Sequence, residues 1–209
     1  MLKHNEQALM DSIEFQRRRQ ALMELMGPGS MAIVPTAPER IRNRDVHYHY
    51  RPDSDFFYLT GFPEPEALAV LVPQREQGQY LLFCRERDQE KEIWHGRRAG
   101  LEGACDYYGA DDAFPITDID DIVPGLMESC RRLYYPLGCY PDFDEKVLEW
   151  LNQLRARVRT GVSIPQEIVT LDHLLHEMRL FKSRAEIETL RVAIELSIQA
   201  HNRIARLWA

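Results

Sequence analysis

Two histidines, His47 and His49, have a spacing from which a metal site could be built. Residues at positions i and i+2 of a strand share a face, so both imidazoles would be available to one ion. A protein metal site needs a third and usually a fourth ligand, and the nearby candidates are Asp45, Asp53 and Asp55. Because these carboxylates are scattered through a loop, two histidines in a polar loop or interface are the favoured interpretation, and a metal site is the alternative.

Trp94 is the second residue in an unusual setting, because its large apolar ring lies within the polar, basic stretch of residues 92–98. One interpretation is a core or edge tryptophan with charged neighbours. The other is a ring on a projecting loop that lines the pocket of another molecule, with Arg97 and Arg98 able to hold carboxylates. The residue chemistry alone favours the first interpretation.

Other catalytic motifs are absent from the sequence. It contains no GxGxxG or GxxxxGK[ST] phosphate-binding loop, no GxSxG nucleophile elbow and no HExxH zinc motif. A cysteine–histidine nucleophile pair stays open, although nothing favours it. The cysteines form no CxxC pair, so we expect reduced thiols that act as small hydrophobic residues. They are Cys84, Cys105, Cys130 and Cys139.

The composition is that of a globular protein with one large domain or one and a half small ones. The chain has 209 residues and a net charge of −7, which argues against nucleic acid as a partner. The one basic cluster, residues 17–19, falls in a helical pattern beside Glu14 and Glu24, so we interpret it as a solvated helix face. The N-terminus lacks the apolar run of a signal peptide and no stretch is apolar enough to span a membrane. We therefore expect a cytoplasmic protein without a membrane partner.

The hydrophobic pattern predicts an α/β fold, with a mixed sheet flanked by helices. We expect helices over residues 8–26, 118–131, 142–157 and 167–178. We expect strands over residues 31–35, 56–60, 67–72, 80–84 and 133–136. The strands at 56–60, 67–72 and 80–84 follow one another closely, which predicts a central antiparallel meander. Residues 36–53 are expected to form a polar loop.

A last helix is predicted from Ser183 to the end of the chain. Ser183 and Glu186 have the spacing of a capping box, in which each side chain bonds the backbone N–H of the other residue. Apolar residues then recur at the helical period, and such a stripe needs a surface to pack against. The plausible domain boundary lies near residues 179–183.

Four blocks of sequence, in this order and spacing, resemble the N-terminal domain of bacterial Xaa-Pro aminopeptidase (aminopeptidase P). The blocks are residues 15–22, 50–67, 92–98 and 176–183. The resemblance implies that residues 1–180 form an α/β domain of the creatinase/prolidase N-terminal type. It also implies that residues 181–209 are the linker and first helix of a missing catalytic domain with the pita-bread fold.

The family's catalytic domain holds two manganese ions through two Asp, one His and two Glu residues, and a bridging water attacks the bond before proline. The resemblance therefore implies a manganese-dependent peptidase that removes the N-terminal residue from peptides with proline in second position. The metal ligands are expected beyond residue 209. We thus expect this chain alone to bind no metal or other cofactor and to hydrolyse nothing without the missing catalytic domain.

In that family the N-terminal domain mediates oligomer contacts and forms one wall of the active-site cleft, often that of a neighbouring subunit. Three residues here match family residues near the substrate: Asp45, Trp94 and Arg159. For Trp94 the resemblance favours the projecting-loop interpretation, whereas the residues around Arg159 diverge from the family. Two alternatives stay open: a non-catalytic peptide-binding or scaffold module of the peptidase-like type, and a fragment with no independent role.

Overall fold

The protein is described here by a computed structural model that covers residues 2–128 and 130–208, with residues 2–11, 160 and 208 as backbone only. The chain divides into two compact units, one ending at Asp172 and one beginning at His173.

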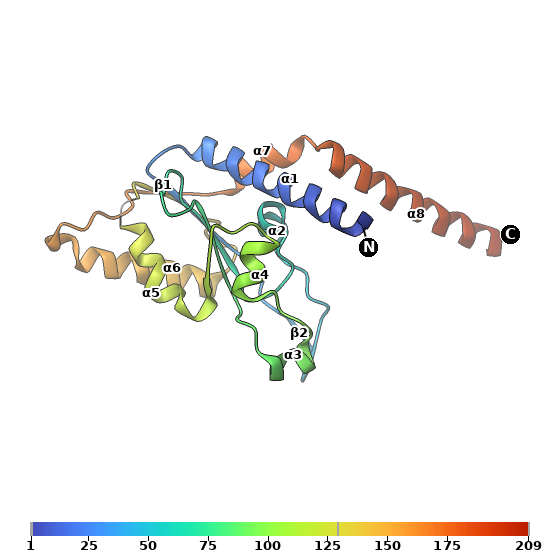
Figure 1. Cartoon of the computed structure of the whole chain (residues 1–209), viewed down its shortest axis with the longest axis horizontal. Coiled ribbons are helices and arrows are strands. Elements are labelled where there is room, and N and C mark those ends of the chain that lie inside the picture. The colour runs from blue at the N-terminus through green and yellow to red at the C-terminus, as the bar shows by residue number, and fades with distance from the viewer. Residues whose placement is uncertain (1, 129, 209) are drawn as a thin grey trace. The chain divides into compact units, whose positions relative to one another are not determined.

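The first unit is built on a six-stranded sheet with the strand order β6-β5-β4-β1-β7-β8. Figure 1 shows this sheet among the helices of the unit. The strands are β1 Ser30–Pro35, β4 Leu68–Leu71, β5 Tyr80–Cys84, β6 Asp112–Pro115, β7 Arg132–Tyr134 and β8 Glu167–Val169. β4 is antiparallel to β1 and β5, and every other neighbouring pair is parallel. The other five strands therefore run in one direction and end at a common edge, which we call the carboxyl edge.

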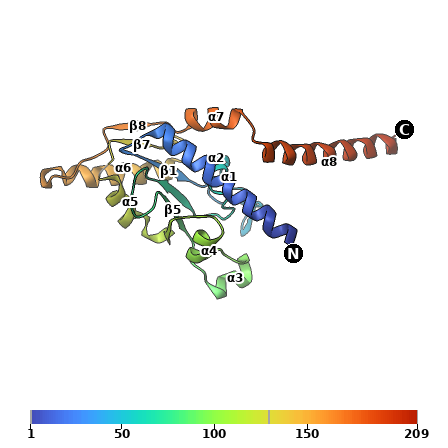
Figure 2. The same cartoon turned by 45° about the horizontal axis from the view of Figure 1, so that its top comes forward.

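Helices lie on both faces of this sheet. The helices of the first unit are α1 Leu2–Met26, α2 Ser54–Thr60, α3 Gln89–His95, α4 Gly100–Asp106, α5 Ile119–Met127 and α6 Pro141–Ala156, of which α3 buries no residue; 3-10 turns form at Ile116–Asp118 and Val158–Thr160. α5 and α6 lie on one side of the sheet and α1 on the other (Figure 2). Met31 and Ile33 of β1 join the core under α5 and α6, where Trp150 and Leu154 are buried. With helices on both faces, β1, β4 and β5 are buried along their whole length, as their continuous apolar sequences require.

The predicted fold class is confirmed, but the predicted strand at residues 56–60 is wrong. These residues form α2, which Asp53 caps by accepting hydrogen bonds from the backbone N–H groups of Asp55 and Phe56 at 2.8 and 3.0 Å. Phe56 and Leu59 are buried at helical spacing, and Gly61 ends the helix in the left-handed conformation. The centre of the sheet is still antiparallel, but its first strand is β1.

Other element boundaries also differ from the prediction. Residues 167–178 begin as strand β8 and become helical only in α7, Asp172–Leu180, whereas α5 ends at Met127. The expected polar loop 36–53 contains a small hairpin of β2 Ile41–Asn43 and β3 Val46–His47. Strand β6 and helices α3 and α4 had no predicted counterpart. The helix predicted at 142–157 corresponds closely to α6.

The basic cluster of α1 is not the solvated face expected from the sequence. Arg18 and Arg19 are only 7% and 4% exposed. Arg18 donates to the carbonyl oxygen of Tyr58 at 3.1 Å, and Arg19 donates to that of Leu59 at 2.9 Å. These carbonyls lie in the last turn of α2, where a helix has no internal partners for them and carries partial negative charge. The arginines therefore complete the C-terminal end of a helix that is distant in sequence.

The second unit contains most of α7 and the long helix α8, Arg184–Trp208. The predicted capping box is confirmed. The backbone N–H of Ser183 donates to the Glu186 carboxylate at 2.8 Å, and the N–H of Glu186 donates to the Ser183 hydroxyl at 3.3 Å. Across both units, no helix in the described part of the chain combines the length and the apolar character needed to cross a membrane.

Candidate functional site

Two segments project from the carboxyl edge of the sheet, one after β1 and one after β5. We call residues 36–50 the hairpin arm and residues 85–99 the Trp94 arm. β1 and β5 are both antiparallel to the β4 strand between them, so both arms leave the same edge. Figure 1 shows β2 of the hairpin arm and α3 of the Trp94 arm together beyond the end of the sheet.

Trp94 is exposed at the end of its arm and is not a core residue. Its side chain lies in α3, is 84% exposed, and is preceded by Ile93 at 78% exposed. Asp88 caps the start of α3 by accepting from the N–H groups of Glu90 and Lys91, and Gly96 ends the helix. No residue of α3 is buried. An indole that is largely in water represents apolar surface that a partner could cover.

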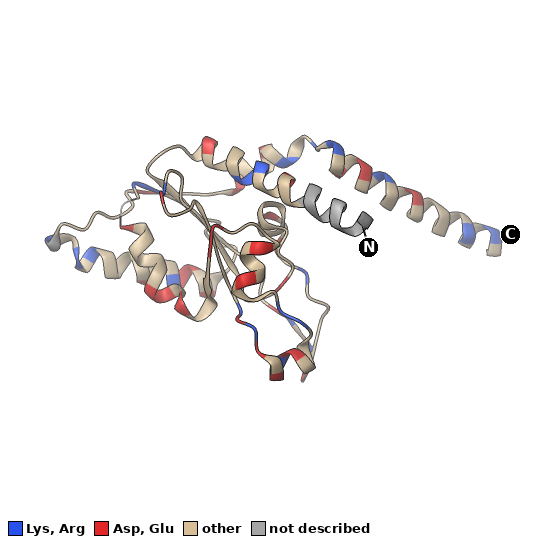
Figure 3. Ribbon diagram, viewed as in Figure 1, with Lys and Arg blue, Asp and Glu red and all other residues tan. Residues whose placement is uncertain are grey.

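Charged groups, rather than apolar packing, hold the Trp94 arm together. Arg87 forms a two-pronged pair with Glu92, with both nitrogen–oxygen distances at 3.1 Å. Glu92 also accepts from the backbone N–H of Arg98 at 3.4 Å. The Arg87 guanidinium is the main cause that lowers the pKa of Glu92 below its ordinary value. Figure 3 shows the acidic residues on α3 and the basic residues on the segments leading to and from it.

Asp45 lies in the tight turn of the hairpin arm, between β2 and β3. The preceding residue, Arg44, has a φ of 51°, and both residues are exposed. The hairpin is exposed on both faces, including Ile41 at 64% and Val46 at 53%. Asp45 and Trp94 thus project from the same edge of the sheet on separate arms.

Arg159 lies at the opposite edge. It belongs to the 3-10 turn Val158–Thr160, which follows α6 and precedes β8. The same connection is anchored beside the beginning of β7, because Ser163 donates to the carbonyl of Glu128 and the N–H of Gln166 donates to that of Arg131. Because β7 begins at the edge opposite to the arms, one copy of the fold does not bring Arg159 together with Asp45 and Trp94.

The two histidines do not gather a set of metal ligands. His47 Nδ1 lies 3.8 Å from an oxygen of Glu39, and both side chains are partly exposed. Within residues 2–128 and 130–208, no group of three or more His, Cys, Asp or Glu side chains is placed to hold a metal ion. The polar-loop interpretation of His47 and His49 therefore describes this hairpin better than the metal site.

A cavity of about 760 Å³ also opens at the carboxyl edge. The cavity lies at the ends of the neighbouring strands β1 and β7. The next strand that the chain adds to the sheet after β1 is on the β4 side, and the next after β7 is β8 on the other side. Crevices at such points are common ligand sites in α/β sheets. Its lining comes from residues 35–40, 66–67, 116, 119, 139–143 and 146. Tyr140, on its wall, donates to Asp53 at 2.8 Å; burial and this carboxylate raise the pKa of the phenol. Sequence reasoning missed this cavity because its residues come from segments that only the sheet topology brings together.

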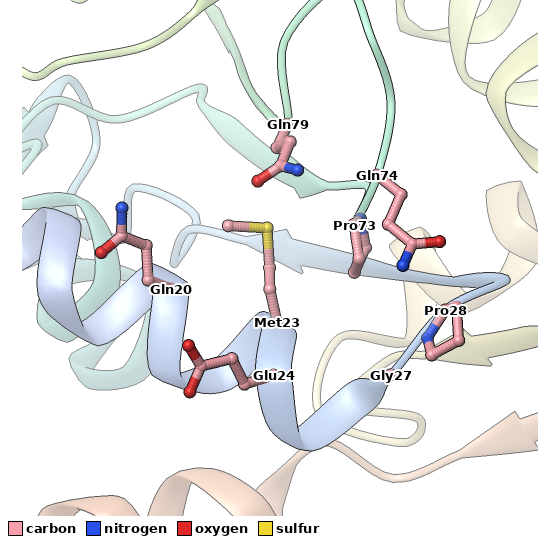
Figure 4. A pocket seen from close by; sticks show the side chains of 8 residues that line it. All are labelled: Gln20, Met23, Glu24, Gly27, Pro28, Pro73, Gln74 and Gln79. Atoms are coloured by element: carbon pink, nitrogen blue, oxygen red, sulfur yellow. The ribbon is translucent and has the colours of Figure 1, made fainter.

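A second cavity, of about 530 Å³, lies at the opposite edge between the end of α1 and the turn from β4 to β5 (Figure 4). Its lining residues are Gln20, Met23, Glu24, Gly27, Pro28, Pro73, Gln74 and Gln79. The amides and one carboxylate provide hydrogen bonds but no nucleophile or acid–base pair, so this cavity offers no evident chemistry.

Comparison with known proteins gives consistent results. Residues 15–134 match the family described as "Aminopeptidase P, N-terminal domain". The Xaa-Pro aminopeptidase of Escherichia coli (strain K12) is 42% identical over 191 residues, which cover 91% of this chain and 43% of that protein. The fold is similar to that of aminopeptidase PepP from Pseudomonas aeruginosa, with a TM-score of 0.90 and 58% identity over 92% of this chain and 43% of that one.

The fold is also similar to E. coli aminopeptidase P with the inhibitor Pro-Leu, with a TM-score of 0.86 and 41% identity over 92% of this chain and 44% of that one. The chain therefore spans less than half the length of these relatives.

Proposed function

The chain belongs to the aminopeptidase P family, and on that premise we propose that it is the N-terminal domain of a manganese-dependent Xaa-Pro aminopeptidase. Such an enzyme removes the N-terminal residue from peptides that have proline in second position. The family inferred from the four sequence blocks is confirmed. We place the protein in the cytoplasm, where free thiols like its four cysteines are typical.

The role proposed for this domain is to form one wall of a substrate cleft. The observation that carries the proposal is the 84% exposed indole of Trp94, at the end of an arm without an apolar core. Tryptophan combines a large contact area with few rotatable bonds and is enriched among residues that dominate binding. In this role Trp94 and Asp45 limit the size and direct the path of a peptide entering the cleft of a catalytic domain.

The position of Arg159 supports a homo-oligomer. Arg159 and Trp94 lie at opposite edges of the sheet, so the two residues of one copy do not line the same cleft. If both positions border a substrate, as in the family, they belong to different copies. The cleft is then completed by residues from neighbouring subunits.

The catalytic metals are assigned to another part of the enzyme. The donor set does not fit two manganese ions, because the described residues provide no group of three carboxylate, imidazole or thiolate ligands. We therefore expect no hydrolysis by residues 1–209 alone.

The test is a cleavage assay with a peptide of the form Xaa-Pro and added Mn²⁺. We expect no cleavage by the purified chain, and cleavage when the catalytic half of the E. coli relative is added as a separate polypeptide. The catalytic half alone is the control. Cleavage by the chain alone contradicts the assignment of the metals. A mixture no more active than the catalytic half alone contradicts the proposed role of this domain.

The cavity at the carboxyl edge favours a second candidate, a non-catalytic peptide-binding module. Its lining includes Pro35, Pro38 and Phe143, an apolar surface that an extended peptide could cover. This function predicts saturable binding of proline peptides by the chain alone and a stable fold without residues 183–209. Calorimetric titration without a catalytic half distinguishes the two functions.

A further inference from the structure

The Trp94 arm is attached to the body of the domain through few contacts. Its helix α3 buries no residue, and Ile93 and Trp94 at its end are mostly in water. A segment with little buried apolar surface is among the first parts of a protein to open. The direction in which Trp94 projects therefore depends on the polar contacts where the arm begins and ends.

One side chain outside the arm contacts both the first and the last residue of the arm. Glu64 accepts a hydrogen bond from the backbone N–H of Ala99 at 2.6 Å, and its other oxygen lies 3.4 Å from Nη2 of Arg85. Arg85 is the first residue of the arm and Ala99 the last. The Glu64 side chain is only 14% exposed, so solvent screens these contacts less than it screens a surface pair.

Glu64 itself lies in a segment whose backbone is restricted and anchored to the core. It lies between Pro63 and Pro65, whose rings restrict the backbone. Phe62, two residues earlier, is fully buried, and its ring packs edge-to-face on Tyr108 at 4.9 Å. The carboxylate is thus fixed to the core, and through it so are both ends of the arm.

Without the Glu64 carboxylate, the largely buried guanidinium of Arg85 would lose its main partner, and the arm would move. The Arg85 side chain is 14% exposed, and its Nε atom is buried with no hydrogen-bond partner among the residues that the structure describes. Apart from Glu64, the acidic group near Arg85 is Glu66, at 3.8 Å and 59% exposed. Leaving a poorly solvated charge with one distant, exposed partner is unfavourable, so Arg85 would turn toward water and displace the beginning of the arm.

The contacts inside the arm have a different effect. The Arg87–Glu92 pair and the bond from the Arg98 N–H to Glu92 join parts of the arm to each other. They preserve its internal shape but do not attach it to the sheet. Orientation and shape of the arm are therefore controlled by different carboxylates.

We propose that Glu64 is a positioning residue that sets the direction of the Trp94 arm and, through Trp94, the selectivity for peptide substrates. This inference deepens the proposed function and rests on it. In the assembled peptidase, loss of Glu64 raises KM for proline peptides several-fold and leaves kcat unchanged, because Glu64 does not touch the reacting atoms.

Fluorine NMR of the chain labelled with fluorotryptophan tests the proposal without any cleavage. The chain has three tryptophans, and Trp94→Phe assigns the resonance of the arm. In Glu64→Ala we expect a shifted Trp94 resonance and exchange of the Ala99 amide, which loses its acceptor, faster by about tenfold. The buried Trp150 keeps its resonance and reports an intact core. Glu64→Gln retains an acceptor for Ala99 and gives a smaller change in the same direction.

Glu76→Ala is the matched control, since Glu76 is an exposed carboxylate in the turn between β4 and β5, at the opposite edge of the sheet. If Glu64→Ala unfolds and loses the Trp150 signal, the Trp94 resonance of Glu64→Gln tests the proposal instead. An unchanged Trp94 resonance and unchanged exchange in a folded Glu64 variant overturn the proposal. An inactive wild-type mixture with a catalytic half contradicts the proposed function instead, and leaves the NMR result to decide on Glu64.

Discussion

Arg18 and Arg19 of α1 use the arginine side chain in a way opposite to Arg87 of the Trp94 arm. In α1, Arg18 and Arg19 are buried, stack on the rings of Tyr58 and Tyr80 at 4.2 and 4.0 Å, and donate to backbone carbonyls. In the arm, Arg87 is 60% exposed and pairs with a carboxylate. The surroundings decide the role: Arg18 and Arg19 are buried against backbone carbonyls and become part of the core, whereas the exposed Arg87 pairs with Glu92 and shapes a projecting segment.

This difference separates stability from function. Removing a buried arginine leaves carbonyl groups without partners, which is costly, whereas exposed ion pairs are screened by water and salt. Loss of Arg18 or Arg19 should therefore destabilise the domain, and changes in the arm should alter where Trp94 lies while the core stays intact.

The largest effect is expected from Arg19→Ala. The substitution leaves the Leu59 carbonyl unpaired and removes the stacking on Tyr80, so we expect the free energy of unfolding to fall by about 2–3 kcal/mol. Urea unfolding followed by circular dichroism measures this loss. Arg17→Ala is the control, because Arg17 is 61% exposed and pairs with Glu14, and it should cost less than about 1 kcal/mol. Equal losses in the two variants would contradict the comparison.

A smaller loss is expected from Asp53→Ala, at the carboxyl edge. Asp53 caps α2 and accepts from Tyr140, so we expect a loss of about 1–2 kcal/mol. Asp53→Asn keeps an oxygen for the two backbone N–H groups of the cap but places an NH2 group, which only donates, toward Tyr140, so it should lose less than the alanine variant. The urea midpoints of the two variants provide the measurement, and an alanine variant as stable as the wild type would show that the cap is dispensable.

The arm should also respond to acid. Arg87 lowers the pKa of Glu92, so in the folded arm the carboxylate stays ionised at and somewhat below its ordinary pKa. A lowered pKa means that the stabilisation is complete above the ordinary value and is lost as pH falls through the folded-state value. The Trp94 fluorine resonance should stay constant from about pH 7 to 5 and move only below about pH 4. The Glu92→Gln variant should lack this transition, and a midpoint above the ordinary glutamate pKa is the contrary result.

The smallest effect on stability is expected from Trp94→Ala. Because the indole is 84% exposed, we expect the free energy of unfolding to change by no more than about 0.5 kcal/mol. Trp150→Ala is the contrasting variant, since Trp150 is 1% exposed and donates to Asp120. A large loss with Trp94→Ala would show that the ring packs against the domain.

Much of the fold could be predicted from the sequence because the signals are local. The runs that form β4, β5 and β1 after Ser30 are apolar, and Ser183 and Glu186 lie within one helical turn. Helix α2 was missed because its aromatic residues favour strands, although Asp53 before it and Gly61 after it are ordinary helix boundary signals. The burial of Arg18 and Arg19 could not be predicted, because their carbonyl partners lie 40 residues away.

The candidate site could be predicted only in part, and mainly from the family resemblance. The chemistry around Trp94 allowed two interpretations, and only the family resemblance favoured the projecting one. The separation of Arg159 from Asp45 depends on the direction of β7, which no local pattern records. The cavity at the carboxyl edge was also missed, since Thr36 and Tyr140 come to line the same cavity only after the sheet forms.

The central claim is that Trp94 borders a peptide in a cleft that this domain shares with a catalytic domain. The most direct test follows the fluorine resonance of Trp94 while Pro-Leu is added to the labelled chain, with and without the catalytic half of the E. coli relative. We expect the Trp94 resonance to shift only when both the catalytic half and Pro-Leu are present, while that of Trp150 stays constant. A mixture that cleaves Xaa-Pro peptides and binds Pro-Leu without any change at Trp94 would contradict it.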